Sequence, residues 1–324
     1  MVSEMSHTDS SPAALPAPPR RVVVIYNPTA GRNRRKRLTD VLDRLAARGL
    51  VVSTRETGRR GDAEEFARLA ALETPPCDVI VAAGGDGTIN EVVNGMAGCG
   101  PGTPMLAIIP LGTANVLACE IGLDVDDSDQ IAETIASGTG RTVHLGTANG
   151  RHFVLMAGIG LDAKVVEGIN ANVTLKRRTG KFAYVVEGVR QALGYDFPAL
   201  EVRADGKIYR GRMAVACRGR YYGGPYVAAP AAKLEEPRLE VCILPKKGMS
   251  GALRYGLALP FGKLSSLPEV EMVSTRAIVV NGPRGAPVQA DGDIVARLPA
   301  EITVATETVD LVVPAGFPPP VSDS

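Results

Sequence analysis

The sequence predicts an α/β domain built on a parallel sheet, followed by a mostly antiparallel β domain. Up to about Arg141, apolar runs of strand length alternate with amphipathic helical stretches, and the connecting loops are short. Beyond Arg141 the alternation gives way to short strand-like runs separated by turn residues. With 324 residues, 45% of them hydrophobic, the chain is long and apolar enough for two such domains.

In the first domain a helix follows each predicted strand. Strands are expected at residues 21–27, 50–54, 78–83 and 105–109, and helices at 33–48, from 61, from 88, at about 113–121 and at 128–136. Parallel strands end at one edge of a sheet, and ligands bind beyond that edge. Four polar segments follow the strand ends and should therefore share one crevice: Asn27, Thr57, Gly84–Thr88 and Leu111–Asn115.

The second domain should contain mainly short strands. They are expected at residues 142–145, 153–157, 200–204, 207–212, 215–217, 239–244, 277–280 and 301–305, with helices near 179–193 and 251–261. We divide the chain into a disordered leader at 1–20, an α/β domain at 21–141, a β domain at 142–314 and a tail at 315–324. The closing part of the β domain is a candidate to pack back on the first domain.

Composition narrows the class of protein. A net charge of +1 argues against a nucleic-acid binder. The basic run Arg32–Arg37 is a solvated helix face, a neighbour of nucleotide phosphate or a contact for anionic lipid. Five cysteines without a C-x-x-C pair indicate a reducing compartment, and three histidines form no zinc pattern. We expect a cytoplasmic protein, because the sequence has no signal peptide and no apolar run of membrane-spanning length.

The stretch Gly84-Gly-Asp-Gly-Thr-Ile-Asn90 is the strongest functional signal. It follows an apolar strand and precedes a helical pattern, so backbone N–H groups and the helix dipole favour an anion there. Asp86 would repel a phosphate unless a cation bridges them or a proton is to be taken, which points to phosphoryl transfer. The alternative is a tight strand–helix turn with an incidental aspartate. The common glycine-rich nucleotide fingerprints are absent.

Four further motifs each allow a structural and a functional interpretation. Asn27–Gly31 and Pro110–Asn115 follow strands and are either ordinary turns and caps or phosphate neighbours. Gly158–Ala163 is either a tight bend or a site loop. Ala290–Asp293 contains Asp-Gly, a hairpin signal that also occurs at Asp205, so Asp291 is a turn residue on local evidence.

Taken in order, these motifs resemble the diacylglycerol kinase catalytic-domain family, which includes bacterial lipid kinases and sphingosine kinases. The resemblance runs from about Arg21 to Pro314, and within this range the stretch Lys176–Tyr184 also resembles a family segment. It implies an α/β domain like that of NAD kinase and phosphofructokinase, joined to an antiparallel β-sandwich. It also implies ATP as phosphoryl donor and Mg²⁺ as cofactor.

The resemblance assigns roles to individual residues. Asp291 corresponds to the proposed base that accepts the proton of the lipid hydroxyl, with Asp293 beside it. Asp86 corresponds to a ligand of the catalytic Mg²⁺, although sphingosine kinases and NAD kinases favour this aspartate as base, so the two assignments compete. From the sequence we prefer Asp291 as base and Asp86 as the ligand or organiser of the catalytic Mg²⁺. The nucleotide-binding residues implied are Asn27, Thr57, Gly84, Gly85, Asp86, Gly87, Thr88, Ile89, Asn90, Gly112 and Thr113.

Two departures from the family pattern affect these expectations. In bacterial members an Asp-Gly stretch holds a structural Mg²⁺. Here Glu236 takes the place of the aspartate, and Pro237 replaces a glycine whose positive φ proline cannot adopt, which puts that metal in doubt. In addition, Val116 follows Asn115 where many members carry an aspartate.

We therefore expect an ATP- and Mg²⁺-dependent kinase that phosphorylates the hydroxyl of a diacylglycerol-like lipid. The alternatives are a sphingoid-base or phosphatidylglycerol kinase, a catalytically weak nucleotide-binding regulatory protein, and NAD kinase. The expected partner is a lipid at the membrane surface, reached through peripheral contact, and no nucleic acid is expected. The sequence does not identify the lipid or the oligomeric state.

Overall fold

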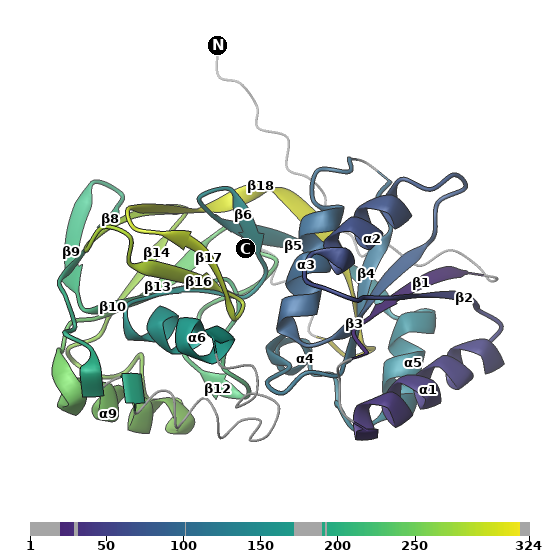
Figure 1. The fold of residues 1–324 in the computed structure, drawn as a ribbon, viewed down its shortest axis with the longest axis horizontal. Helices are drawn as coiled ribbons and strands as arrows, with labels where there is room; N and C mark the ends of the chain where they lie inside the picture. The colour runs from purple at the N-terminus through teal and green to yellow at the C-terminus, as the bar shows by residue number, and fades with distance from the viewer. Residues whose placement is uncertain (1–19, 29–31, 101, 172–189, 192, 318–324) are drawn as a thin grey trace, which may run out of the picture.

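The computed structural model describes residues 20–28, 32–100, 102–171, 190–191 and 193–317. The first domain alternates strands and helices, as predicted (Figure 1). Its elements are β1 (Arg21–Tyr26), α1 (Arg32–Ala47), β2 (Val51–Glu56), α2 (Asp62–Ala71), β3 (Val79–Gly84), α3 (Asp86–Met96), β4 (Met105–Pro110), α4 (Val116–Glu120) and α5 (Ser128–Ser137).

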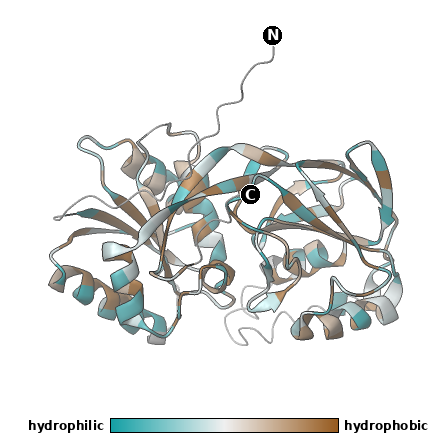
Figure 2. Ribbon diagram, turned by 180° about the vertical axis from the view of Figure 1, so that it is seen from behind, coloured by the Kyte–Doolittle hydropathy of each residue, from teal (hydrophilic) through white to brown (hydrophobic). Residues whose placement is uncertain are grey.

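The strands of this domain form a parallel sheet in the order β2-β1-β3-β4. Every residue of the central strand β3 is buried, because helices cover both faces of the sheet. α1 packs with α5, and α2 packs with α3. Figure 2 shows apolar residues, in brown, gathered on the strands between these helix pairs.

The second domain consists mainly of antiparallel strands. Its elements are β5 (Thr139–Ala148), β6 (Arg151–Phe153), β7 (Met156–Ile159), α6 (Leu161–Ala171), β8 (Leu200–Ala204), β9 (Lys207–Gly211), β10 (Met213–Cys217), β11 (Tyr221–Tyr222), β12 (Tyr226–Val227), β13 (Leu239–Leu244), α9 (Gly248–Ala258), the 3₁₀ helix η1 (Leu259–Phe261), β14 (Glu271–Thr275), β15 (Ala277–Asn281), β16 (Pro287–Ala290), β17 (Asp293–Arg297) and β18 (Ala300–Val313).

Two sheets face each other in this domain. One has the order β14-β13-β10-β7-β16-β17, and the other contains β18, β15, β8 and β9. Apolar residues from both sheets, among them Val202, Val241 and Ile278, form a common core. This arrangement confirms the predicted antiparallel second domain.

The last strand joins the two domains. β18 pairs in antiparallel fashion with β5 and β15, and Leu311 near its end pairs in parallel with Leu106 of β4. The sheet of the first domain therefore continues into the second. The end of β18 pairs with β4 of the first domain, whereas most of β18 pairs with strands of the second domain.

The element boundaries differ from the predicted ones where the chain turns sharply. α3 starts at Asp86 instead of Thr88 because Gly85 already serves as its N-cap. α4 starts only at Val116 because Asn115 has a left-handed conformation, with φ of 48°. The expected strand 153–157 is broken into β6 and β7. α6 and the strands β11, β12, β14, β16 and β17 were not predicted.

Several sequence-based predictions fall on residues outside the described ranges. These are the leader up to residue 19, the motif residues 29–31 and 176–184, most of the expected helix 179–193, and the end of the tail at 318–324. Among the described residues, no helix combines the length and the apolarity needed to cross a bilayer.

Candidate functional site

The ends of the parallel strands are tied together by backbone hydrogen bonds. The N–H of Thr57, beyond β2, donates to the last carbonyl of β1 at 2.9 Å. The N–H of Asn27, beyond β1, donates to the carbonyl of Ala83 in β3 at 3.2 Å. The N–H of Leu111, beyond β4, donates to the carbonyl of Gly84 at 2.8 Å. The polar segments predicted to share one edge of the sheet are therefore brought together there.

The glycine loop before α3 touches the loop before α4. A Cβ placed on Gly112 would lie 2.5 Å from the Cα of Gly85, and a Cβ on Gly85 would lie 3.1 Å from the Cα of Gly112. Only residues without a side chain allow the two backbones to approach so closely. The N-terminus of α3 and the loop 110–115 consequently form one continuous surface on which backbone N–H groups are available to an anion.

Part of the basic run in α1 reaches this surface. Arg34 Nη2 donates to the hydroxyl of Thr113 at 3.2 Å, and Arg37 Nη1 donates to the carbonyl of Pro110 at 3.1 Å. The two residues between these arginines are exposed. The run therefore does not act as a single patch, because two of its members face the loop that follows β4 and two face solvent.

Asp86, the first residue of α3, connects α3 with α4. Its Oδ1 accepts a hydrogen bond from the backbone N–H of Val116 at 2.8 Å. Burial, together with the negative charge of Asp291, raises the pKa of Asp86 to about 6. The two carboxyl groups, one from each domain, are thus close enough to influence each other.

Asp291 is held by four hydrogen bonds. Its Oδ1 accepts from the backbone N–H groups of Leu155 and Met156, each at 3.0 Å. Its Oδ2 accepts from the N–H of Val154 at 2.7 Å and from Asn90 Nδ2 at 3.1 Å. Burial raises the pKa of Asp291, while the four donors act in the opposite direction by favouring the carboxylate. These bonds also explain the break between β6 and β7, where the N–H groups turn away from the sheet.

Asp291 is at the same time a turn residue. Asp291 and Gly292 have φ angles of 47° and 90° and connect β16 with β17 as a two-residue hairpin loop. Asp293, the next residue, forms an ion pair with Arg60 at 3.3 Å. Its Oδ2 lies 3.4 Å from the position that a Cβ on Gly87 would occupy, so this carboxylate stands beside the glycine loop.

Asp162 is linked to this turn by hydrogen bonds through Gln289, a role that the sequence did not reveal. Its carboxylate accepts hydrogen bonds from the hydroxyl of Tyr222 and from Gln289 Nε2, the latter at 2.7 Å. Gln289 Oε1 in turn accepts from the N–H of Gly292 at 2.9 Å. Burial raises the pKa of Asp162. The sequence motif 158–163 contains both Asp162 and Gly158. The structure explains this glycine, because a Cβ on Gly158 would lie 1.7 Å from Asp162 Oδ2.

Further polar contacts fix the two domains relative to each other. Arg151 of β6 forms a two-point ion pair with Glu64 of α2 at 3.0 and 2.6 Å. Asn94 of α3 donates to the carbonyl of His152 at 3.0 Å and accepts from its N–H at 3.1 Å. Helices α2 and α3 of the first domain and strand β6 of the second domain are therefore joined by direct bonds.

The chain matches known proteins over nearly its whole length. Residues 21–148 match the family described as diacylglycerol kinase catalytic domain, and residues 156–313 match the YegS C-terminal NAD kinase beta sandwich-like domain. The diacylglycerol kinase of Bacillus subtilis is 30% identical over 298 residues, which are 91% of this chain and 97% of the relative. That of Staphylococcus aureus is also 30% identical, over 91% of this chain and 93% of the relative.

The chain belongs to the diacylglycerol kinase family. Members of this family are lipid kinases, as the resemblance of the motifs implied. A putative diacylglycerol kinase from Bacillus anthracis superimposes with a TM-score of 0.73 at 23% identity, covering 92% of this chain and 99% of that one. A second structure from the same organism gives 0.71 at 26% identity, over 91% and 97%. The shared architecture confirms the predicted fold class.

The resemblance to bacterial members implied a structural metal near Glu236, and the residues present here do not fit one. The Glu236 carboxylate forms an ion pair with Lys233 at 2.5 Å. Within the described ranges, no three or more histidine, cysteine or acidic side chains are grouped as metal ligands. The assignment of Glu236 as a metal ligand therefore receives no support from its surroundings.

The individual residues of the glycine loop contribute in different ways. The side chain of Ile89 is 3% exposed and packs in the core of the first domain, so it can offer a ligand only its backbone. The side chain of Asn90 is 2% exposed and is engaged with Asp291 and the carbonyl of His152. Among the predicted residues, Thr57 is also buried and bonds the end of β1 through its hydroxyl at 3.3 Å.

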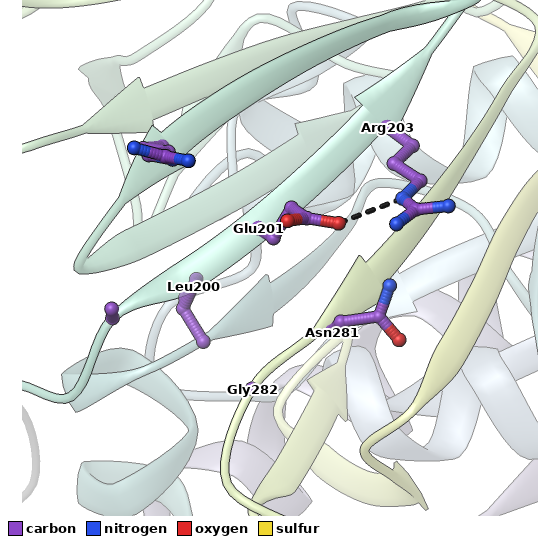
Figure 3. A pocket seen from close by; sticks show the side chains of 7 residues that line it. Leu200, Glu201, Arg203, Asn281 and Gly282 are labelled. Carbon is purple, nitrogen blue, oxygen red and sulfur yellow. Dashed lines mark hydrogen bonds and ion pairs between the residues drawn. The ribbon is translucent and has the colours of Figure 1, made fainter.

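A separate hollow lies on the second domain, away from this crevice. It has a volume of about 540 Å³ and lies between β8, β9 and the end of β15 (Figure 3). Within it, Arg203 Nε donates to Glu201 Oε1 at 2.7 Å. It lies open on an exposed face and includes none of the motif residues, so we do not assign it a function.

Proposed function

We propose that this chain transfers the γ-phosphoryl group of ATP to the hydroxyl of a diacylglycerol-like lipid in the crevice between its domains. The observation that carries the proposal is the hydrogen bond of 3.1 Å between Asn90 of α3, the helix that follows the glycine loop, and Asp291 of the second domain. This bond joins an anion-binding helix terminus to a buried carboxylate, the two components that phosphoryl transfer to an alcohol requires.

The first domain supplies the phosphate side of the reaction. Backbone N–H groups at the start of α3 and around Gly112 would bind phosphate oxygens, and Thr113 would add a hydroxyl. Arg34 reaches Thr113 at 3.2 Å and contributes a positive charge beside the same loop. Catalysis by these groups comes from alignment of the phosphoryl group and from neutralisation of its charge.

We assign proton acceptance to Asp86 and a positioning role to Asp291. All four hydrogen bonds of Asp291 come from donors that are themselves buried or part of the backbone, so a lipid hydroxyl would have to displace one of them. Asp86 is partly exposed, and its pKa, raised to about 6 by burial and by the charge of Asp291, suits proton transfer near neutral pH. The proton would move late, because a carboxylate is too weak to ionise an alcohol beforehand.

The donor set around Gly87 fits a magnesium ion bound together with ATP. Mg²⁺ is usually held by one or two carboxylates plus substrate phosphates, and Asp293 stands beside the glycine loop, so Asp86 is not needed as a ligand. When bound, the ion would neutralise charge on the phosphates. Asp293 is kept in place by its ion pair with Arg60.

The lipid requires contact with a bilayer, and α9 with η1 is the element that fits this role best. Four apolar side chains at intervals of four residues are exposed along it: Met249 37%, Leu253 59%, Leu257 59% and Phe261 76%. Exposed Lys247 and Lys263 lie at its two ends. In Figure 1, α9 and α1 lie along the same lower edge of the molecule. An apolar helix face flanked by lysines suits an interface with anionic headgroups.

The proposal is tested by incubating the purified chain with γ-labelled ATP, Mg²⁺ and a panel of acceptors. The panel contains diacylglycerol, a sphingoid base, phosphatidylglycerol and NAD. We expect the label on diacylglycerol. Label on another lipid would reassign the substrate, and label on NAD would contradict the lipid-kinase proposal. ATP binding without transfer to any acceptor would indicate a regulatory nucleotide-binding protein.

A further inference from the structure

Arg218, directly after β10, is a wholly buried cation. Its side chain is 0% exposed. The guanidinium donates to three backbone carbonyls: Nε to His144 at 3.1 Å, Nη2 to Leu234 at 2.6 Å, and Nη1 to Arg238. Its own backbone N–H donates to the carbonyl of Leu155 at 2.7 Å. An arginine is almost never buried so completely unless its donors are satisfied.

The electrostatics of this site resemble those of a metal site. Three carbonyl oxygens converge on one positive group, as they would on a bound cation. Burial lowers the pKa of Arg218 to about 10, and the negative charge of Glu236 partly offsets this effect. Arg218 therefore remains charged at neutral pH. The charge is balanced by backbone dipoles and by a nearby carboxylate that is itself engaged with Lys233.

Two of the three carbonyls belong to the stretch 230–240. This stretch corresponds to the family's structural metal loop, and Pro237 stands in it where a glycine is expected. We propose that Arg218 is a built-in cation that replaces the structural divalent metal ion, and that this loop binds no metal. The guanidinium donates hydrogen bonds to the carbonyls of Leu234 and Arg238. Because it is part of the chain, the loop keeps its shape without an exchangeable ion.

Arg218 and a divalent ion exclude each other at this position. A metal beside the guanidinium would place three positive charges in a buried volume whose oxygens already accept hydrogen bonds. Magnesium also requires close to six oxygen ligands in an octahedron. Around the loop, the carboxylates of Glu235 and Glu236 are instead paired with Arg141 at 3.3 Å and Lys233 at 2.5 Å.

The backbone of Arg218 is connected to the carboxylate of Asp291 through Leu155. The carbonyl of Leu155 accepts from the N–H groups of Arg218 and Gly219 at 2.7 and 3.2 Å. The N–H of the same Leu155 donates to Asp291 Oδ1 at 3.0 Å. The link runs through the backbone N–H of Arg218 and not through its guanidinium, so it ties the residue that follows β10 to the segment that holds Asp291.

Thermal unfolding of the nucleotide-free chain tests the inference without reference to the lipid substrate. We expect the same melting temperature in excess Mg²⁺ or Ca²⁺ and after exhaustive chelation, and less than one retained divalent ion per chain by elemental analysis. A melting temperature that falls on chelation, both in the wild type and in Asp293→Asn, would overturn the inference. The Asp293→Asn variant separates this site from a metal held beside the glycine loop.

Substitution of the arginine provides the second arm. Arg218→Met keeps most of the volume but removes one hydrogen-bond donor from each of three carbonyls, although the carbonyl of Leu234 still accepts from the N–H of His144 at 3.0 Å. The melting temperature should therefore fall by about 5 °C or more, equally with and without metal. Arg238→Met is the matched control, because it removes an exposed arginine side chain from the same loop and should leave the melting temperature unchanged. A wild-type melting temperature in Arg218→Met would refute the proposal. If this variant does not fold, the metal response of the wild type decides alone.

Discussion

Replacing Asp291 by asparagine should destabilise the fold as well as reduce activity. Asparagine fits the turn, because it tolerates the φ of 47° that this position requires. It also keeps the size and shape of the side chain. The substitution therefore changes little besides the hydrogen bonds, since one carboxylate oxygen that accepts becomes an amide nitrogen that donates.

The magnitude follows from the contacts of the two oxygens. Whichever way the amide is oriented, its nitrogen faces two donors: either the N–H groups of Leu155 and Met156, or the N–H of Val154 and the amide of Asn90. Each buried donor left unpaired costs about 1–3 kcal/mol, so the loss should be on the order of 2–6 kcal/mol.

Urea unfolding of wild type and variant measures this loss directly. Asp205→Asn is the matched control, because Asp205 occupies the same kind of Asp-Gly hairpin loop, with φ of 47°, but is exposed. Its side-chain hydrogen bond, from the hydroxyl of Thr275 at 3.1 Å, can also be accepted by an amide oxygen. The cost of this control substitution should stay within about 0.5 kcal/mol. If Asp291→Asn unfolds at the wild-type urea concentration, the four hydrogen bonds do not hold the turn, and the positioning role assigned to Asp291 is wrong.

Four other predictions concern the crevice and the bilayer contact. The rate should fall as pH drops through about 6, because Asp86 must be unprotonated to accept a proton, and a pH–rate profile of Asp86→Asn should lack this inflection. Gly112→Ala should weaken ATP binding in calorimetry, since its Cβ would force the two loops apart; unchanged affinity would argue against a shared phosphate surface. Tyr222→Phe should lower kcat with little change in the KM for ATP, and a changed KM alone would contradict its link to the turn. Leu253→Gln combined with Leu257→Gln should reduce the co-sedimentation of the protein with anionic vesicles, and Ile208→Gln, at an exposed position on β9, is the control substitution. Unchanged sedimentation of the double variant, or loss of a dimer instead, would exclude the membrane contact.

The alternation of strands and helices was sufficient to predict the first domain. The apolar run at Val79–Gly84 and the helical pattern after it correspond to β3 and α3. The second domain was harder, because the break between β6 and β7 depends on Asp291, more than 130 residues away in sequence. Periodicity along the chain carries no information about such a bond.

The candidate site was predictable as a set of residues but not as a set of roles. Motif order placed Asp86 and Asp291 in one crevice. Only the three-dimensional contacts reveal that Asp291 is saturated with hydrogen bonds, which moves the proton-acceptor assignment to Asp86. The burial of Arg218 was likewise hidden, because an arginine in a turn after a strand is normally exposed.

The most direct test of the account is the rate at which label passes from γ-labelled ATP to diacylglycerol in mixed micelles. Wild type and Asp86→Asn are compared after both have been shown to melt at the same temperature. We predict labelled phosphatidate from the wild type and a rate at least about 100-fold lower from the variant. A folded wild type that labels no lipid, or a variant as fast as the wild type, would contradict the account.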